Sequence, residues 1–554
     1  MTRSAPHRAP PNRLPAGLLG ALAVAPAVFL GLFYLWPFVT LLARAAGVDD
    51  GALRVLGRTA TWQVIWFTTW QAVLSTVLTI VVGLAPAYVL ARFRFRGRRL
   101  LGGLLTSAFV LPTVVMGAAM LALFPPSLER GIWAILAAHV TFNLAVVVHT
   151  VGAVWRYLPE DMEAAAATLG ASPARVAAEI TLPLLWPAVL AAGAIVFGFT
   201  FTSYGVVRIL GGVARSTVEV EIWRRATQLG DIGGAAVLAI GQLLVIGAVV
   251  AWSTAQQRRH SRALDLRARA RRRHPRRGRE RPFVAVTAAV TAAIVVAPLV
   301  ALAERSLRTR TGHSLEAWRT LGRPEVRRGI RVGVDPLAAL GHSATTAAIA
   351  TTLAVGLGAL AALAIAAAGR RGRWLDVGLM LPLATSAVTI GFGMLITFDQ
   401  APYDWRASWW LVPVGHALVA VPFVVRSVLP VLRGVDPGRL AAAATLGAAP
   451  VRAWWEVVVA HLWRPLLPAA GVAAAISLGE FGATSFLSRR GGETVPVAIE
   501  RLLGRTGAVL QAQAYALAVI LAAATIAVVL MLEPPEERVD ALTRAGAGAD
   551  ARRS

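Results

Sequence analysis

A single carboxylate, Glu480, lies inside a strongly apolar stretch of the sequence at residues 466–487. An ionised side chain costs free energy in the hydrocarbon of a membrane, so such a residue is by default a functional candidate. Two roles fit it. The carboxylate could contact a solute or a gate in a water-filled path, or it could accept backbone hydrogen bonds at a helix break near Gly479 and Gly482.

Hydroxyl and aromatic side chains lie near Glu480 and in an earlier apolar stretch. Such hydroxyl groups either line a solute path or bond one helix to another, and the sequence leaves both roles open. Besides Glu480, the candidates for a solute path are Thr200, Thr202, Ser203, Tyr204, Ser477 and Phe481.

Metal chemistry has little support in this sequence. Cys is absent, which excludes thiolate sites and disulfides. His139 and His416 fall at the outer ends of two long apolar stretches, but two imidazoles without neighbouring carboxylates make a poor metal site. We expect hydrogen bonding at the membrane interface for both, and we predict neither a metal site nor catalytic residues.

The basic residues exclude further classes of function. Lys is absent, whereas a P-loop needs a lysine to reach the nucleotide phosphates, so the chain cannot hydrolyse ATP by that route. The net charge is +26, and the arginines gather in short clusters between apolar stretches. This is the positive-inside pattern of a membrane protein, so we expect lipid and not nucleic acid as a partner.

Long apolar stretches must position the candidate residues. The chain has 554 residues, of which 56% are hydrophobic, and a mean hydropathy of +0.63. This is enough for about a dozen spans of roughly 20 residues. The arginine clusters place both termini in the cytoplasm. We predict an all-α, multi-pass protein of the bacterial cell (inner) membrane with spans near 16–42, 62–91, 101–124, 132–155, 187–210, 233–255, 283–303, 341–368, 375–398, 408–432, 466–487 and 509–532.

The second half of the chain repeats the first at a constant offset. The offset that relates His139 to His416 also relates Ile222 to Ile499, so there is no net insertion between them, and we call residues related in this way equivalent. Six spans in each half make this a parallel repeat, related by an axis along the membrane normal. We predict a first repeat at 1–257, an arginine-rich cytoplasmic linker at 258–282, a second repeat at 283–532 and a polar tail at 533–554.

Each repeat contains a long polar loop, at about 156–186 and 433–465, and we call these two segments the coupling loops. The first contains AAAATLGASPAR and the second AAAATLGAAPVR. Alanines favour a short helix, Gly170 and Gly447 a left-handed stop, and Pro173 and Pro450 the first turn of a second helix. Closing a helical hairpin needs about 2 to 8 residues, so loops of about 30 favour docking of a partner protein.

These loops resemble the EAA motif of ATP-binding-cassette importer permeases, in which a coupling helix docks on the ATPase subunit. The likeness extends to LPTVVMGAAMLAL at 111–123, FTSYGVVRILGG at 201–212 and SLGEFGATSFL at 477–487. It is closest to fused, double-length permeases of the iron(III) and thiamine group. By this resemblance the docking residues are Glu163, Ala164, Ala165, Gly170, Pro173, Ala442, Ala443, Gly447 and Pro450.

The resemblance implies a type I importer permease fold and a set of partners. Two copies of an ATPase subunit would dock on the coupling loops, and ATP would be used only there, with no cofactor bound by this chain. An extracytoplasmic binding protein would deliver a small solute, iron(III) or thiamine-like, to segments 217–223 and 494–501. Glu163 stands one position earlier than the motif glutamate, and Leu440 replaces it in the second loop. The docking surface should therefore be apolar.

Two other classes of protein compete with an importer permease. A secondary transporter driven by an ion gradient predicts paired acids or bases within the spans, and only Glu480 stands out. A membrane-embedded enzyme predicts acids or histidines clustered near one membrane face, and the sequence has no such cluster.

Overall fold

The computed structural model describes residues 16–532 apart from short gaps. These are residues 47–50, 159, 213–214, 261–271, 310–311, 323–324, 328–329, 332–333, 400–403, 406–407 and 506. The predicted polar tail, the N-terminal arginines, most of the arginine-rich linker and both chain termini lie outside the described residues.

The chain divides into two compact units. Unit 1 draws on the ranges Met1–Thr40, Gly341–Ser488 and Ala523–Ser554, and unit 2 on Leu41–Leu340 and Arg489–Ala522. Three helices have residues in both, namely α2 (Trp36–Ala46), α16 (Pro336–Ala368) and α25 (Ala508–Leu532).

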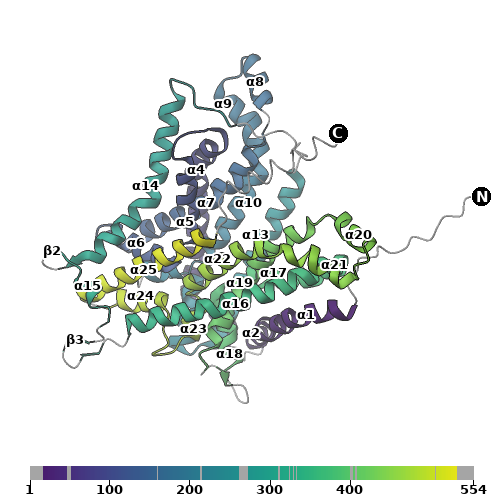
Figure 1. The fold of residues 1–554 in the computed structure, drawn as a ribbon. Helices are drawn as coiled ribbons and strands as arrows, with labels where there is room; N and C mark the ends of the chain where they lie inside the picture. Colours follow the sequence, from purple (N-terminus) through teal and green to yellow (C-terminus); the bar gives the residue numbers. More distant parts are fainter. Residues whose placement is uncertain are drawn as a thin grey trace, which may run out of the picture. The chain divides into compact units, whose positions relative to one another are not determined.

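Unit 2 contains most of the first predicted repeat (Figure 1). Its other helices are α3 (Gly51–Leu56), α4 (Thr59–Arg92), α5 (Arg98–Val110), α6 (Thr113–Leu123), α7 (Ile132–Trp155), α8 (Glu160–Thr168), α9 (Pro173–Val176), the π-helix η2 (Ala177–Thr181), α10 (Leu182–Phe201), α11 (Gly205–Leu210), α12 (Val218–Arg224), the π-helix η3 (Arg225–Leu229), α13 (Ile232–His260), α14 (Glu280–Leu307), α15 (Glu316–Arg319) and α24 (Val495–Leu503). Two small antiparallel hairpins follow α14, β1 (Arg308–Thr309) with β2 (Gly312–His313), and β3 (Glu325–Arg327) with β4 (Ile330–Arg331).

Unit 1 contains most of the second predicted repeat. Its other helices are α1 (Ala16–Leu30), the π-helix η1 (Gly31–Leu35), the 3-10 helix η4 (Gly369–Gly372), α17 (Arg373–Ala384), α18 (Ala387–Thr397), α19 (Leu411–Arg433), α20 (Pro437–Thr445), α21 (Pro450–Val457), the 3-10 helix η6 (Val459–His461), α22 (Trp463–Gly479) and α23 (Thr484–Leu487).

The predicted all-α architecture is confirmed, and eleven of the predicted spans have a counterpart among the described residues. Nine helices are long and apolar enough to cross a membrane, and two bent pairs correspond to the predicted spans 101–124 and 375–398. The pair α5 and α6 bends by 107° where Pro112 keeps Leu111 extended, and the pair α17 and α18 bends by 99°. The remaining predicted span, 466–487, is instead the 17-residue α22, which ends at Gly479 before a short break and α23.

Each unit includes the first span of the opposite predicted repeat. In unit 2, α14 packs on α4, α5 and α6, and Val295 joins a core cluster with Leu105 and Leu144. In unit 1, α1 packs on α17, and η1 places Phe33 against the ring of Phe398 with centroids 5.9 Å apart. The compact units therefore do not follow the boundary that the sequence repeat predicts.

A close helix crossing recurs in both units. In unit 2 a Cβ on Gly83 of α4 would come within 2.7 Å of Val147 on α7, and in unit 1 a Cβ on Gly358 of α16 would come within 2.6 Å of Val424 on α19. The two valines occupy equivalent positions of the repeat, so each half packs these helices at the same point. Close packing through glycine is how membrane helices gain contact energy without a hydrophobic driving force.

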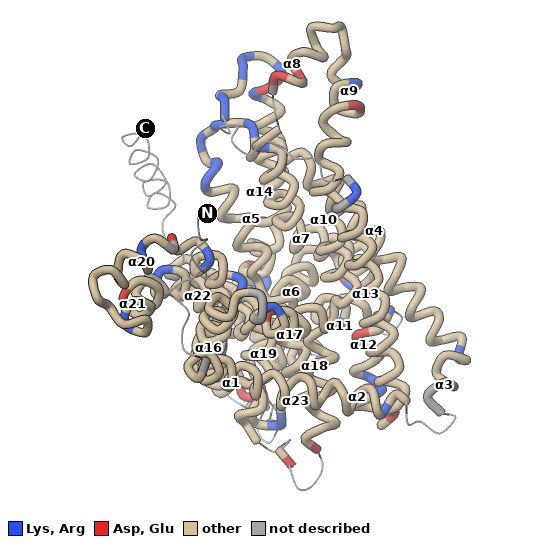
Figure 2. Tube along the Cα trace, turned by 90° about the vertical axis from the view of Figure 1, so that its right-hand side faces the viewer, with Lys and Arg blue, Asp and Glu red and all other residues tan. Residues whose placement is uncertain are grey.

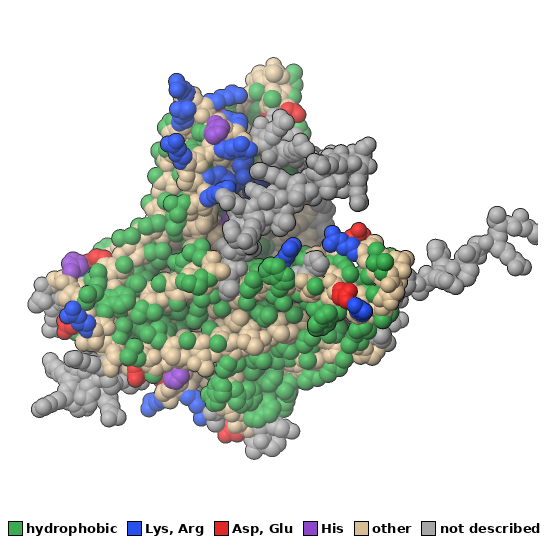
Figure 3. Space-filling model, in the orientation of Figure 1, with side chains coloured by type: hydrophobic (Ala, Val, Ile, Leu, Met, Phe, Trp, Pro, Cys, Tyr) green, Lys and Arg blue, Asp and Glu red, His purple; other side chains and the backbone are tan. Residues whose placement is uncertain are grey.

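Charged and hydrophobic side chains gather on different parts of the surface. Figure 3 shows arginines gathered round the end at which α14 begins and hydrophobic side chains over much of the face in view. Arg273 bonds back to residue 92 through its backbone and pairs with Glu280 at 2.7 Å. The described end of the predicted linker is thus attached to the turn between α4 and α5.

Candidate functional site: two coupling loops and the buried polar groups behind them

The two coupling loops fold by the same local chemistry. Helices α8 and α20 have nine residues each and begin at equivalent positions, Glu160 and Pro437. Gly170 has φ +84° and Gly447 φ +86°, the left-handed conformation that ends a helix cheaply only at glycine. In the first loop Ala171 N–H donates to Ala166 O and Gly170 N–H to Ala167 O, each at 3.0 Å, and the second loop repeats both bonds. The predicted left-handed stops are confirmed.

The second helix of each loop begins at the predicted proline, but the loops then diverge. Pro173 is the first residue of α9 and Pro450 the first residue of α21. In the first loop the chain continues through η2 into α10 as one helix of 29 residues. In the second loop α21 ends at Val457, and a 3-10 turn precedes α22. The first loop is therefore joined to its span without a break.

Both loops present an apolar surface. Figures 1 and 2 show α8 and α9 at the projecting end of the long helix that contains α10. Leu169 is 88% exposed and its equivalent Leu446 is 89% exposed. Of the predicted docking residues, Glu163 and Ala443 are partly buried, and the others are exposed: Ala164, Ala165, Gly170, Pro173, Ala442, Gly447 and Pro450.

Glu163 does not point outward from the first loop. Its carboxylate pairs with Arg92 of α4 at 3.4 Å and accepts a hydrogen bond from the Thr181 hydroxyl at 2.9 Å. Arg92 is 5% exposed and also donates to Leu158 O at 3.2 Å. This glutamate thus ties α8 to its own helical bundle, a contact that sequence reasoning missed because the two partners are 71 residues apart.

Glu480 occupies a buried site at the break between α22 and α23. Its two carboxylate oxygens accept backbone hydrogen bonds from Ala483 and Thr484, each at 2.9 Å, and Oε2 accepts a third bond from the Thr484 hydroxyl at 2.7 Å. His416 Nε2 lies 3.3 Å from Oε2. The carboxylate therefore caps α23, which is the hydrogen-bonding role that the sequence left open.

Both ring nitrogens of His416 have hydroxyl partners. Nε2 lies 2.7 Å from Thr484 Oγ1, and the Thr484 hydroxyl also bonds the Glu480 carboxylate. Nδ1 lies 2.8 Å from the Ser477 hydroxyl. His416 thereby links α19 to α22 and α23.

The equivalent histidine of the first repeat lies in a neutral site. His139 Nε2 is 2.9 Å from the Ser203 hydroxyl, and Nδ1 is 3.0 Å from the Ser75 hydroxyl. Ser203 is the residue of the first repeat that is equivalent to Glu480. The predicted hydrogen bonding of both histidines is confirmed, and both side chains are buried, since His139 is 2% and His416 1% exposed. Their place at the membrane interface stays a prediction. Each packs between helices.

Six of the seven predicted solute-path residues are buried, and the seventh, Thr202, is partly buried. None of the six is more than 7% exposed, and they are Thr200, Ser203, Tyr204, Ser477, Glu480 and Phe481. Thr200 donates to the carbonyl of Val196 in its own helix at 2.9 Å, which satisfies its hydroxyl as the helix-bonding alternative requires. A role for these residues in a solute path stays a prediction.

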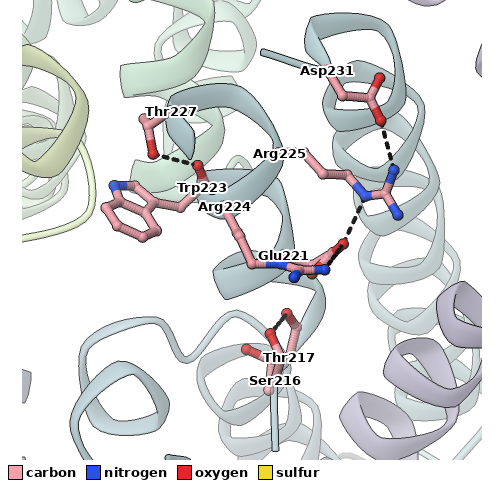
Figure 4. Close-up of polar contacts among 8 residues, drawn as sticks. All are labelled: Ser216, Thr217, Glu221, Trp223, Arg224, Arg225, Thr227 and Asp231. Atoms are coloured by element: carbon pink, nitrogen blue, oxygen red, sulfur yellow. Dashed lines mark hydrogen bonds and ion pairs between the residues drawn. The ribbon is translucent and has the colours of Figure 1, made fainter. Parts of the chain in front are cut away.

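The segments expected at 217–223 and 494–501 form the short helices α12 and α24. Thr217 and Thr494 precede them with the same extended backbone, and most of both helices is buried. Figure 4 shows Arg225, which is 4% exposed, between Glu221 at 2.8 Å and Asp231 at 2.6 Å. Glu221 also binds Arg224, and this hydrogen bond raises the pKa of the Arg224 guanidinium.

Sequence reasoning also missed Arg208 of α11. This side chain pairs with Glu500 of α24 at 2.8 Å and lies over the ring of Trp223 of α12. An arginine inside an otherwise apolar stretch was the available signal, since such a residue needs a partner. Within the described residues, no group of three His, Asp or Glu side chains could hold a metal ion.

The many apolar helices and the two projecting loops define a multi-pass membrane transport protein. The family described as "Binding-protein-dependent transport system inner membrane component" matches residues 75–262. The chain belongs to this family, the permease subunits of ATP-binding-cassette importers.

Three relatives show how the similarity is distributed. The putrescine transport system permease protein PotI of Escherichia coli is 29% identical over 212 residues, which are 36% of this chain and 74% of PotI. The putative 2-aminoethylphosphonate transport system permease protein PhnV of Salmonella typhimurium is 31% identical over 207 residues, 36% of this chain and 75% of PhnV. The thiamine transport system permease protein ThiP of Brucella melitensis is 26% identical over 514 residues, 89% of this chain and 91% of ThiP. This last alignment covers both repeats, so the chain is of the double-length type.

Proposed function

We propose that this chain is the membrane-spanning part of an importer that is driven by a separate ATPase. Two copies of the ATPase subunit dock on the two coupling loops, and a substrate-binding protein delivers a small solute on the other side. ATP is used by the partner subunits, and this chain binds no cofactor. Both termini lie in the cytoplasm of a bacterial cell, with the membrane lipid around the spans.

The equal geometry of the two coupling loops carries this proposal. Leu169 and Leu446 project to nearly the same extent from helices of the same length, which end in the same glycine turn. A large apolar side chain that stays in water has no folding role, and repeating it at the same point of two loops favours a partner groove on each. One chain would then bind two ATPase subunits.

The sequence supports ATP hydrolysis by a separate subunit. Lys is absent, so the chain has no P-loop of its own, and energy from ATP has to enter through a bound subunit. An ion gradient is the competing source. In the described part of the chain, the Glu480 carboxylate accepts three hydrogen bonds at a helix start, which favours a structural role for it over proton transport.

The solute is proposed to be small and either thiamine-like or iron(III). The double-length relative is named for thiamine, whereas the half-length relatives are named for putrescine and 2-aminoethylphosphonate. Thiamine is therefore the first solute to test. Iron(III) rests on the sequence resemblance.

The proposal is tested with purified chain, its ATPase subunit and its binding protein in liposomes. We expect uptake that needs ATP and survives collapse of the proton gradient. The double variant Leu169→Ser/Leu446→Ser should lose ATPase binding and uptake, while the control Met531→Ser, at another exposed apolar side chain (82% exposed), should keep both. Uptake that continues without ATP and stops with the proton gradient would establish a secondary transporter instead.

A further inference from the structure

One arginine of the first repeat contacts a helix from each repeat. The Nη2 atom of Arg208, on α11, is 2.8 Å from Oε1 of Glu500 on α24. The same guanidinium lies over Trp223 of α12, with Cζ 4.2 Å from the ring centroid. The side chains of Arg208 and Glu500 are 27% and 22% exposed, so the pair is partly shielded from water. An arginine between a carboxylate and an indole face gains from both contacts.

The two partners of Arg208 stand at the same position of the two repeats. Trp223 and Glu500 are related by the same offset as the two coupling loops. The equivalent of Arg208 is Ser485, whose hydroxyl donates to Gly482 O at 2.7 Å. Arg208 therefore joins equivalent points of α12 and α24, and the first repeat alone supplies the joining side chain.

Helix α12 is fixed to the helices behind it. The ion pairs of Arg225 with Glu221 and Asp231 connect α12 to the start of α13, and Asp231 also accepts a hydrogen bond from Gly234 N–H at 2.9 Å. Figure 4 shows Trp223 pointing away from these ion pairs. Trp223 consequently moves only when α12 and α13 move together.

Helix α24 is fixed as well. Arg501 pairs with Glu493 just before the helix, and Ile499 and Leu502 are fully buried. Because each helix is held by its own contacts, any motion that separates α12 from α24 must break the contacts of Arg208.

The position of this contact suggests its role. Helix α10 leads from the first coupling loop at Leu182 to Phe201, and α11 and α12 follow that far end. We propose that Arg208 is a positioning residue that holds the two repeats closed at the end of the path remote from the coupling loops. The bridge breaks each time the path opens there. This inference rests on the proposed function, since it assumes that the ATPase drives that opening.

Cross-linking in the assembled complex tests the bridge directly. Because the chain has no cysteine, the double variant Arg208→Cys/Glu500→Cys can be joined by a short bifunctional thiol reagent without background. We expect cross-linking in the resting complex and loss of it after trapping with ATP and vanadate. Cross-linked complex should retain its ATPase subunits but lose uptake. The control pair Arg273→Cys/Glu280→Cys, at the ion pair near the start of α14, should cross-link in both states and leave uptake unchanged.

Charge reversal supplies a second and independent measurement. Breaking the bridge by Arg208→Glu or Glu500→Arg should raise ATP hydrolysis in the absence of binding protein about fivefold, the population shift expected from losing one partly shielded ion pair. The double variant Arg208→Glu/Glu500→Arg should return hydrolysis toward the original rate. Trp223→Ala removes only the stacking and should have a smaller effect.

The outcomes separate this inference from the proposed function. If the ATPase subunit does not bind at all, the proposed function fails. If the complex assembles and transports, two results would refute the proposed role of Arg208 and leave the proposed function intact. One is equal cross-linking in the resting and trapped states, and the other is transport by the cross-linked chain. Unchanged basal hydrolysis in both reversal variants would also refute that role.

Discussion

The two coupling loops share one surface but are attached to the protein in different ways. Both end in the same glycine turn and expose the same leucine, Leu169 or Leu446. Behind that surface, Glu163 of the first loop binds Arg92 and Thr181, whereas the equivalent position of the second loop is Leu440. The outward face is thus kept the same, while the inward contacts differ.

This difference suggests how each loop could pass on a movement. The first loop is joined to α10 through an unbroken helix and to α4 through the buried guanidinium of Arg92. The second loop has a 3-10 turn between α21 and α22. A displacement of the first loop should therefore move its membrane spans with less deformation than a displacement of the second loop would. The repeat keeps the exposed surface of the two loops the same, whereas each half supports its loop with different contacts.

At the two histidine sites the carboxylate lies in the second repeat, whereas at positions 163 and 440 it lies in the first. In the first repeat His139 bonds the Ser203 hydroxyl, and in the second His416 lies beside the Glu480 carboxylate. At these equivalent positions, the first half thus has a carboxylate at residue 163 and an uncharged partner for its histidine, whereas the second half has leucine at residue 440 and a carboxylate beside its histidine. Substitutions at paired positions can test this reading of the two halves.

The largest effect is expected from Glu480→Leu. This change leaves the backbone N–H groups of Ala483 and Thr484 without their acceptor, at about 1–3 kcal/mol for each buried group, and removes the carboxylate beside His416. The matched variant Ser203→Ala removes one hydroxyl contact and should cost about 1 kcal/mol. Thermal unfolding of the purified chain in detergent measures both. Equal losses would show that the two histidine sites do not differ as described.

A smaller effect is expected at the support of the first loop. Glu163→Leu removes the carboxylate that pairs with the buried Arg92, and should cost about 2–3 kcal/mol, below the range for fully buried pairs because Glu163 is 30% exposed. Glu163→Gln keeps an acceptor for Thr181 and should cost less. Proteolysis of the loop in the folded chain would report the loss locally. No change in cleavage would mean that the ion pair does not hold the loop.

The local features of these loops could be predicted from sequence, and their supports could not. Gly170, Gly447 and the prolines after them act through their own backbone angles, so a short pattern is enough to place them. The partner of Glu163 and the helix that Glu480 caps depend on how separate segments pack. The 17-residue length of α22 has the same origin, because the apolar pattern continues through residue 487 while the backbone breaks at Glu480.

The glycine turns should respond alike, since the two loops are the same there. Gly170→Val or Gly447→Val forces a β-branched residue into the left-handed region, at a cost of about 1–2 kcal/mol to the loop. Each variant should weaken ATPase binding by a similar factor in a pull-down with the partner subunit, and Gly→Ala should fall between. A loss confined to one loop would mean that one ATPase copy, and not two, depends on this geometry.

The smallest effect is expected when the glutamate is copied into the second loop. Leu440→Glu places a carboxylate at the position of Glu163, but the equivalents of Arg92 and Thr181 are Gly369 and Val458, which offer no cation and no hydroxyl. Because position 440 is only partly buried, the new carboxylate can reach water, and unfolding free energy should change by no more than about 0.5 kcal/mol. Adding Val458→Thr supplies one hydrogen bond without the guanidinium and should recover a few tenths of a kcal/mol at most. Stabilisation comparable to the loss in Glu163→Leu would contradict the assignment of the first loop's support to Arg92.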